Sequence, residues 1–274
     1  MSETLLTIQE LTKEYILSNG KKLTACNELS LSIKKGQTLG VVGESGSGKS
    51  TLANMLMLIE KPTKGSIFYH DKNLLMLKKH EIHQLRPNIQ IVFQDPQASL
   101  NPKMKVIDTV VEPLINYKRL DKKNKYAKAI ELLQMVDLSE DYLNRYPRQL
   151  SGGQCQRVSI ARALALEPEL LICDEATSAL DASVQKSIID LLIKLQQQTQ
   201  MAMLFISHDL ALVHSLTDEL LVMKNGVIVD RLFQAQDMIK SKVSYTQSLL
   251  TSVYSLKKVK EQLIKNEQNK EYTP

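Results

Sequence analysis

The sequence predicts an α/β fold in which helices cover a parallel sheet. Short apolar runs, such as residues 38–43, 169–173 and 202–208, have the length and composition of buried strands. Helical patterns separate these runs along the chain. Strands that alternate with helices form a parallel sheet covered on both faces, because each crossover brings the chain back to the same end of the sheet.

Length and composition favour one core with an inserted subdomain. The chain has 274 residues, of which 43% are hydrophobic, enough for a sizeable core. Its formal net charge is +5, but the basic runs at 122–128 and 256–260 lie far apart and carry few aromatic residues. This pattern is typical of solvated surfaces and gives no support for nucleic-acid binding. Three scattered cysteines indicate a reducing compartment, and no run approaches the ~20 apolar residues of a membrane span.

The first 95 residues are expected to contain short strands and one helix. Strands are predicted at 5–11, 28–35, 38–43, 66–70 and 88–94, and a helix over 48–60. From Pro96 to about Ala165 the pattern becomes helical, with loops marked by proline.

Strands return after the helical region. Residues 169–173 and 202–208 flank a helical run at 184–197, and residues 218–229 are predicted to form a hairpin that turns at Asn225–Gly226. The chain is therefore divided into a core of residues 1–95 and 166–230, a helical subdomain of residues 96–165, and a C-terminal extension of residues 231–274.

The stretch GESGSGKST indicates a phosphate-binding loop. It fits the pattern GxxxxGK[ST], follows an apolar strand and precedes a helical pattern, whereas a merely flexible Gly/Ser turn would not need that context. Lys49 is expected to reach the β- and γ-phosphates, and Ser50 to ligate Mg²⁺. The predicted nucleotide-binding residues of this loop are Gly43, Glu44, Ser45, Gly46, Ser47, Gly48, Lys49, Ser50 and Thr51.

Polar residues at the ends of other apolar strands complete a candidate hydrolytic site. Asp174 and Glu175 follow one strand, where Asp174 is expected to hold the metal and Glu175 to act as general base. The alternative interpretation is that Asp174 and Glu175 only cap a helix that follows the strand. Gln94 and His208 end two further strands, and together with the loop they are interpreted as catalytic sensors of the γ-phosphate, Gln94 also as a metal ligand.

A second glycine-rich turn, LSGGQ at 150–154, also precedes a helical pattern. Ser151, Gly152 and Gly153 would offer N–H groups and the positive end of a helix dipole to a phosphate. A plain helix N-cap is the alternative interpretation.

The order of these motifs resembles that of the ATP-binding subunits of ABC transporters. Along the chain come Tyr15, GESGSGKST, Gln94, LSGGQ, LLICDE, SALD at 178–181 and His208, which together span about residues 4–230. The resemblance implies a P-loop NTPase core with a parallel sheet, an antiparallel β subdomain and an inserted helical subdomain.

The resemblance also implies how the two glycine-rich turns work together. Two subunits would pair head to tail, so that each ATP lies between the loop of one chain and Ser151, Gly152, Gly153 and Gln154 of the other. Tyr15 would stack on the adenine ring, and Asp181 would cross the interface. The helical insert would contact the membrane subunits, with Gln94 coupling phosphate occupancy to transport.

Narrower features are similar to the ATPases of oligopeptide, dipeptide and nickel importers: FQDPQASLNPKM at 93–104, VEPL at 111–114, NRYPRQLSGGQ at 144–154 and YTQSLL at 245–250. The chain departs from that subgroup at Cys155, where Arg or Lys is usual, and at Val243–Ser244, where His-Pro is common. No cysteine follows Cys173, so no iron–sulfur cluster is expected in the extension. Peptide, nickel and metal chelates remain alternative cargoes.

By this resemblance, the chain is expected to hydrolyse ATP with Mg²⁺ at the cytoplasmic face of the cell membrane and to power an importer. Its partners would be integral membrane permeases, a second ATP-binding subunit of the same or a paralogous sequence and, indirectly, an extracytoplasmic solute-binding protein, with no nucleic acid.

The alternative is a soluble ABC-type ATPase acting on nucleic acid or ribosomes. Such proteins usually carry two cassettes, a long coiled-coil insertion or zinc cysteines, none of which the sequence shows. A metabolic P-loop kinase or GTPase would have no use for LSGGQ.

Overall fold

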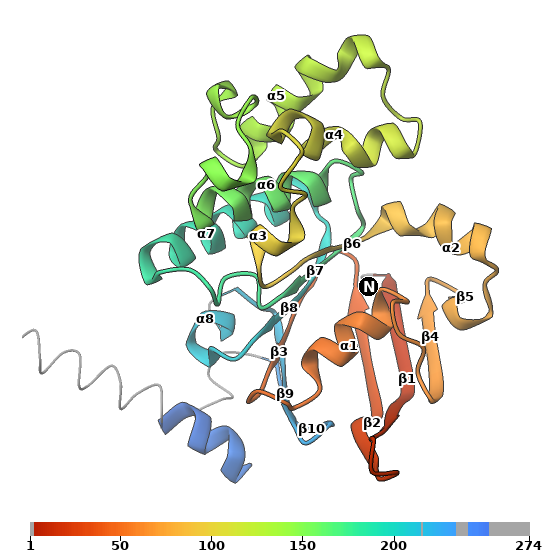
Figure 1. The fold of residues 1–274 in the computed structure, drawn as a ribbon. Helices are drawn as coiled ribbons and strands as arrows, with labels where there is room; N and C mark the ends of the chain where they lie inside the picture. Colours follow the sequence, from red (N-terminus) through yellow and green to blue (C-terminus); the bar gives the residue numbers. More distant parts are fainter. Residues whose placement is uncertain (1–2, 215, 234–240, 252–274) are drawn as a thin grey trace, which may run out of the picture.

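The structure is a computed structural model that describes residues 3–214, 216–233 and 241–251. Its centre is a six-stranded sheet in the order β10-β9-β3-β8-β7-β6 (Figure 1). The strands are β3 Thr38–Val42, β6 Ile89–Val92, β7 Leu170–Asp174, β8 Ala202–Ser207, β9 Glu219–Lys224 and β10 Val227–Leu232. Neighbouring strands from β9 to β6 are parallel, which confirms the predicted α/β fold.

The strand β10 pairs antiparallel with β9 through the predicted hairpin, with Val227 opposite Lys224. Asn225 and Gly226 both have positive φ, 50° and 80°, as the tight primed turns of hairpins require. The predicted turn position is therefore confirmed.

A second sheet, in the order β2-β1-β4-β5, is antiparallel throughout. Its strands are β1 Thr4–Ile16, β2 Lys22–Lys34, β4 Lys64–Tyr69 and β5 Lys72–Asn73. This sheet is the antiparallel β subdomain that the resemblance implied.

Alternate residues of the central strands face two different apolar clusters. Leu170 and Ile172 pack with the antiparallel sheet and with α1, Lys49–Leu56. Leu171 and Cys173 pack with α6, Gly152–Leu164, and with α7, Ala182–Thr199. Both faces of the central sheet are thus covered. On one face the antiparallel sheet packs beside α1, whereas the alternation of strands and helices along the chain predicted helices alone.

The region between β6 and β7 is helical, as predicted (Figure 1). It contains α3 Pro96–Ser99, α4 Val106–Asn116, α5 Lys125–Met135 and α6, with 3₁₀ turns at Lys122–Asn124, Glu140–Tyr142 and Pro147–Gln149. Apolar residues of α4, α5 and α6 belong to the same cluster as the face of α7. One continuous core therefore joins these helices to the central sheet, and the boundaries at residues 96 and 165 remain a prediction.

The first helix is shorter than the sequence suggested. The structure ends α1 at Leu56, and Leu58 takes a left-handed conformation with φ of 54°, which is incompatible with a helix continuing to residue 60. The remaining short helices are α2 Lys79–Leu85 and α8 Leu210–His214, with 3₁₀ turns at Leu74–Met76 and Arg86–Asn88.

Part of the C-terminal extension is described. Residues 244–251 are helical, with Tyr245, Thr246 and Leu250 buried. The rest of the predicted extension, residues 234–240 and 252–274, lies outside the described residues. Within the described part of the chain, no helix has both the length and the apolar character to cross a membrane.

Candidate nucleotide-binding site

The loop between β3 and α1 has the backbone geometry of an anion cradle. Gly46 and Gly48 adopt φ of 79° and 101°, and Gly48 caps the helix. The first helical hydrogen bond is donated by the Leu52 N–H to the Gly48 carbonyl. The N–H groups of the preceding helical turn therefore have no helical acceptor and are available to phosphate oxygens.

The loop is packed too closely for side chains at two of its glycines. A β-carbon on Gly43 would lie 2.2 Å from the carbonyl oxygen of Met223, at the end of β9. One on Gly48 would lie 2.2 Å from the carbonyl oxygen of Ala25 in β2. The loop is therefore wedged between strands of both sheets, which holds its shape.

Lys49 is the first residue of α1, and its side chain turns back to the loop. Its Nζ donates to the carbonyl oxygens of Gly43 at 2.7 Å and Glu44 at 2.9 Å, and only 3% of the side chain is exposed. Burial lowers the pKa of Lys49, while the nearby Glu175 and Asp174 carboxylates act in the opposite direction. The buried ammonium group can exchange its carbonyl partners for phosphate oxygens without a long movement.

Asp174 is the last residue of β7, which lies two strands away from β3 in the sheet. Its Oδ1 accepts a hydrogen bond from Ser50 Oγ at 3.2 Å, and burial raises its pKa. A hydroxyl and a carboxylate at this distance form the type of oxygen pair that Mg²⁺ prefers, so the residues fit the ion.

Glu175 occupies the centre of the predicted catalytic group. It has φ of 49°, outside the extended range, and its N–H donates to the Ile206 carbonyl at 2.9 Å. Its Oε1 lies 3.8 Å from Lys49 Nζ, and its Oε2 lies 3.6 Å from Nδ1 of His208. The turn after β7 therefore directs Asp174 and Glu175 to different partners.

Gln94 stands apart from these contacts. The strand β6 ends at Val92, so that Gln94 lies in the loop beyond it and is exposed. The register of β6 against β7, with Val92 opposite Cys173, places Gln94 at the same edge of the sheet as the two acids. Among the described residues, however, it makes no hydrogen bond or ion pair, so its roles as sensor and metal ligand remain predictions.

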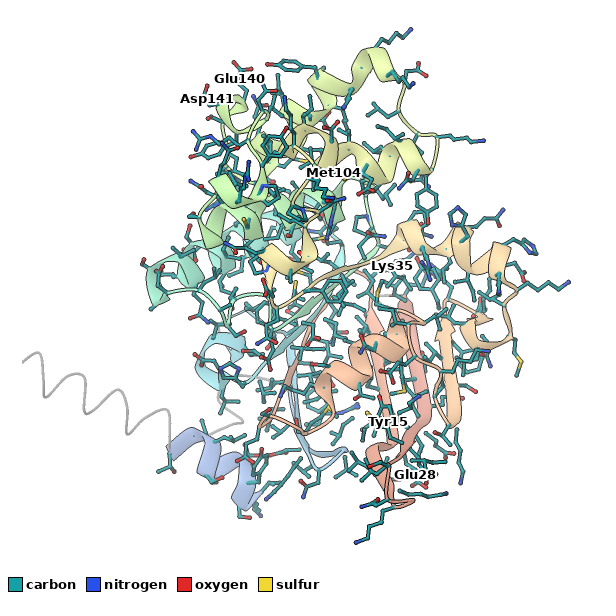
Figure 2. The ribbon with its side chains drawn as sticks, in the orientation of Figure 1. Tyr15, Glu28, Lys35, Met104, Glu140 and Asp141 are labelled. Carbon is teal, nitrogen blue, oxygen red and sulfur yellow. The ribbon has the colours of Figure 1, made fainter. Side chains whose placement is uncertain are left out.

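Tyr15 lies near the end of β1 (Figure 2). Its hydroxyl donates to the Glu60 carboxylate, and Lys13 Nζ lies 5.0 Å from the centre of the ring. These contacts fix the ring while leaving it partly exposed. Stacking on adenine remains a prediction.

The second glycine-rich turn forms the N-terminus of α6. Ser151 is the N-cap: its Oγ accepts from the Gln154 N–H at 3.3 Å, and Gln154 Oε1 accepts from the Ser151 N–H at 2.9 Å. Gln154 Nε2 also donates to the Tyr142 hydroxyl at 3.0 Å. Ser151 is exposed and lies on a fixed helix start.

The start of α6 packs against the start of α7. Asp181 caps α7, where its Oδ1 accepts from the Val184 N–H at 3.0 Å and from Ser183 Oγ at 2.7 Å. These hydrogen bonds, the backbone one first, lower the pKa of Asp181. Gly153 faces Val184 in this contact, where a side chain would not fit. Packing within the chain therefore requires a glycine here, apart from any contact of this turn with phosphate.

The two glycine-rich turns do not meet within this chain. Among the described residues, no hydrogen bond or ion pair joins 150–154 to 43–51. Their helices also pack into different apolar clusters, α1 on one face of the sheet and α6 on the other.

Several residues that hold the loop and Tyr15 in place were not predicted from the sequence. The Gly226 N–H donates to the Ser47 carbonyl at 3.0 Å, and the Glu44 N–H donates to the Tyr245 hydroxyl at 3.1 Å. Glu60 was also missed, although it binds Tyr15. These contacts join distant segments, and no local pattern in the sequence could have indicated them.

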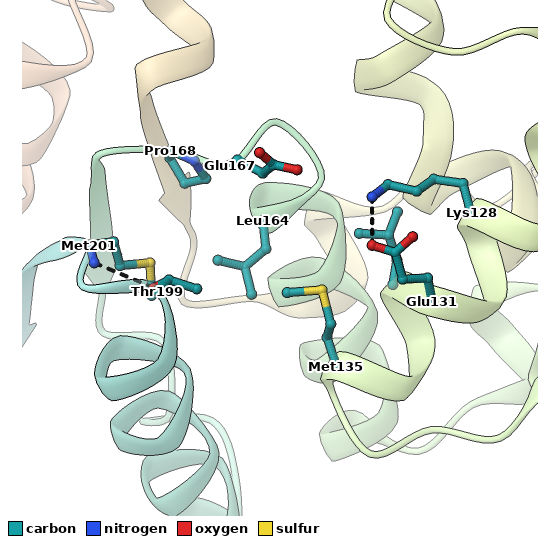
Figure 3. Close-up of a pocket in the computed structure, with 9 residues that line it drawn as sticks. Lys128, Glu131, Met135, Leu164, Glu167, Pro168, Thr199 and Met201 are labelled. Atoms are coloured by element: carbon teal, nitrogen blue, oxygen red, sulfur yellow. Dashed lines mark hydrogen bonds and ion pairs between the residues drawn. The ribbon is translucent and has the colours of Figure 1, made fainter.

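A separate pocket of about 360 Å³ lies among α5, the end of α6 and the end of α7 (Figure 3). Lys128 and Glu131 form an ion pair of 2.7 Å at its rim, and Leu164 and Met201 contribute apolar surface. None of its lining residues belongs to the predicted nucleotide site.

Comparison with known proteins agrees with this geometry. The profile of the ABC transporter family matches residues 26–178. A probable peptide ABC transporter ATP-binding protein of Sinorhizobium fredii is 42% identical over 258 residues, covering 92% of this chain and 73% of the relative. The oligopeptide transport ATP-binding protein OppF of Salmonella typhimurium is 40% identical over 260 residues, covering 92% and 78%.

Solved structures give the same assignment. A dimeric ATP-binding cassette in a post-hydrolysis state with ADP and Pi has a TM-score of 0.76 and 31% identity, covering 84% of this chain and 98% of its own. A component of a Clostridium perfringens ABC transporter complex also has a TM-score of 0.76, with 30% identity and coverage of 88% and 92%. Motif order, fold and relatives agree, and the chain belongs to the ABC transporter family.

Proposed function

We propose that the chain is the ATP-binding and ATP-hydrolysing subunit of an ABC importer for peptides, in which two such subunits pair head to tail around ATP. The observation that carries the hydrolytic part is the Glu175 carboxylate, which lies between Lys49 Nζ and His208 Nδ1. Relatives named for peptide and oligopeptide transport support peptides over nickel or metal chelates as cargo.

ATP is bound in this proposal by the loop of residues 43–51. Unpaired N–H groups at the start of α1 would hold the β-phosphate, and Lys49 would turn from the Gly43 and Glu44 carbonyls to the β- and γ-phosphates. Tyr15, fixed by Glu60, would support the adenine ring.

Glu175 would accept a proton from the attacking water. Its carboxylate is 17% exposed, so a water molecule can reach it, and its two oxygens have different neighbours. Oε1 faces the lysine that binds phosphate, and Oε2 faces His208, which would orient the carboxylate or contact the γ-phosphate. Gln94, at the same edge, would sense the occupied site.

Ser50 and Asp174 would hold Mg²⁺, with Gln94 as a further ligand. The ion, when bound, would neutralise charge on the β- and γ-phosphate oxygens.

The lack of contact between the two turns within one chain supports the proposed pairing of subunits. Among the described residues, the turn at 150–154 makes no hydrogen bond or ion pair with residues 43–51, and the N–H groups of Gly152 and Gly153 at the start of α6 suit a phosphate. A second chain would present this turn to the ATP on the first, with Asp181 nearby. The dimeric relative bound to ADP and Pi supports this arrangement.

Complementation between two inactive variants tests the head-to-tail pair. Lys49→Ala damages the loop, and Ser151→Ala damages the second glycine-rich turn. Each variant alone therefore forms a pair with two defective sites. A mixed pair has one site with both defects and one intact site. We expect ATPase activity to return when the two are mixed, to between a quarter and a half of wild type. No recovery, with both variants folded and wild-type activity rising steeply with protein concentration, would contradict the pairing.

The membrane permeases, an indirectly acting solute-binding protein and the cytoplasmic membrane face belong to the same proposal. Co-purification from gently solubilised membranes tests it: recovery of integral membrane proteins is expected, whereas recovery of RNA or ribosomes would favour the nucleic-acid-associated ATPase.

A further inference from the structure

The extension beyond β10 contacts the nucleotide-binding loop. The hydroxyl of Tyr245, in the helix of residues 244–251, accepts a hydrogen bond of 3.1 Å from the backbone N–H of Glu44. The tyrosine is only 7% exposed, and Lys224 Nζ lies 4.4 Å from the centre of its ring. A residue 201 positions away in the sequence therefore reaches the second residue of the loop.

This hydrogen bond acts on the peptide group that holds Lys49. The N–H of Glu44 and the carbonyl of Gly43 belong to one peptide unit, and that carbonyl accepts from Lys49 Nζ at 2.7 Å. The two groups of a trans peptide point in opposite directions. Tyr245 and Lys49 thus hold the same peptide from opposite sides and fix its orientation.

The position of Tyr245 is itself fixed by the end of the sheet. Thr246, which is fully buried, donates from Oγ1 to Asp230 Oδ2 at 2.7 Å, and Ser241 Oγ donates to the same oxygen. Tyr245 and Leu250 also belong to the apolar cluster that contains the faces of β9 and α7. The helix is therefore anchored to β10 and to the core by contacts that do not involve the loop.

We propose that Tyr245 is a positioning residue for ATP binding, which fixes the orientation of the Gly43–Glu44 peptide at the start of the nucleotide-binding loop. The inference rests on the proposed function, because it concerns the same site. It gives the extension a specific role: the helix of residues 244–251 holds the nucleotide-binding loop in the conformation that accepts phosphate.

Tyr245→Phe in the full chain tests the proposal, because it removes one hydroxyl and keeps the ring beneath Lys224. A lost hydrogen bond predicts an increase of about 3- to 10-fold in the KM for ATP and in the Kd of a fluorescent ATP analogue, with kcat changed by less than about 2-fold. The Glu44 amide should also exchange its hydrogen faster. Water can replace the hydroxyl at the exposed Glu44, so little change in Tm is expected.

Two further variants complete the test. Thr246→Val keeps the shape of the side chain but removes the bond to Asp230, so it should raise KM in the same direction as Tyr245→Phe. Ser248→Ala, which removes only a bond to the Tyr245 carbonyl within the helix, should leave KM unchanged.

Unchanged KM, Kd and Glu44 exchange in Tyr245→Phe would overturn the inference, even if Tm fell. If the wild-type chain binds ATP normally, an unchanged Tyr245→Phe variant would leave the proposed function intact. A wild-type chain that binds no ATP would instead overturn the proposed function itself.

Discussion

Gly153 of α6 and Val184 of α7 approach so closely that a β-carbon on Gly153 would lie 2.5 Å from Val184 Cγ1. Valine on a helix has essentially one side-chain rotamer, so this methyl group cannot turn away. The first turn of α6, including Ser151, is therefore located by its contact with α7. The second glycine-rich turn therefore contributes to the stability of the fold, in addition to its proposed contact with phosphate.

Gly153→Ala is expected to lower the free energy of unfolding by about 1–3 kcal/mol, because it overpacks this contact. The double variant Gly153→Ala/Val184→Ala should recover most of that loss, as measured by chemical unfolding. ATP binding to the isolated chain should stay normal in both, while ATPase activity falls in the single variant. Equal destabilisation of the single and double variants would show that the contact is not the cause.

Glu175→Gln is expected to retain ATP binding and to lower kcat by about 10²- to 10⁴-fold, because it removes the proposed base and spares the phosphate contacts. Equilibrium binding and single-turnover hydrolysis measure the two effects separately. Glu131→Gln, which changes an exposed carboxylate on α5, is the matched control and should behave as wild type. Weak ATP binding with normal turnover in Glu175→Gln would exclude the proposed role.

Asp174→Asn is expected to stabilise the nucleotide-free chain. Burial raises the pKa of Asp174 above its ordinary value of 3.8, so the folded chain binds that proton more tightly than the unfolded chain does. The free energy of unfolding therefore falls as pH rises through the interval between the two pKa values, and the full cost is present at neutral pH.

Removing this charge should raise the free energy of unfolding by about 1 kcal/mol, or Tm by about 2–4 °C, at pH 7. The gain should disappear below the unfolded pKa, where the carboxyl is protonated in both states. Asp190→Asn, at an exposed site on α7, should show no such gain. A lower Tm for Asp174→Asn at neutral pH would contradict the argument. Binding of Mg²⁺-ATP should weaken in the same variant.

The cysteines are expected to be unreactive in the native chain. Cys26, Cys155 and Cys173 are each fully buried, and burial raises the pKa of Cys26 and of Cys173 to about 12. Thiolate, the reactive form, is therefore scarce at neutral pH. A thiol reagent should label none of the three at pH 7.5 and all of them after unfolding, without loss of native ATPase activity. Rapid labelling with inactivation would instead indicate a redox role.

The sequence predicts a site in which the chemical groups lie at or after the ends of buried strands. Lys49 and His208 come after β3 and β8, and Asp174 is the last residue of β7; these three strands are neighbours in the sheet. Parallel strands bring such residues to one edge of a sheet. The Lys49–Glu175 and Glu175–His208 distances are consistent with this reasoning.

Other features depend on packing between segments that no local pattern connects. The contact of Glu44 with Tyr245 and that of Gly153 with Val184 arise only when the chain has folded. The end of α1 before residue 60 could not be predicted either, because the residue that takes the left-handed conformation after the helix is Leu58 and not a glycine. The antiparallel sheet was implied by resemblance to the family, since alternating strands alone do not reveal their partners.

The shared core between the helical region and the central sheet limits how this protein can be re-engineered. Leu132 of α5, Val158 of α6, Ile188 of α7 and Phe205 of β8 all belong to one cluster. Grafting α4 to α6 from a relative would place foreign side chains against α7 and leave mismatched volumes at the seam. A functional chimera must therefore take the inner face of α7 from the same donor.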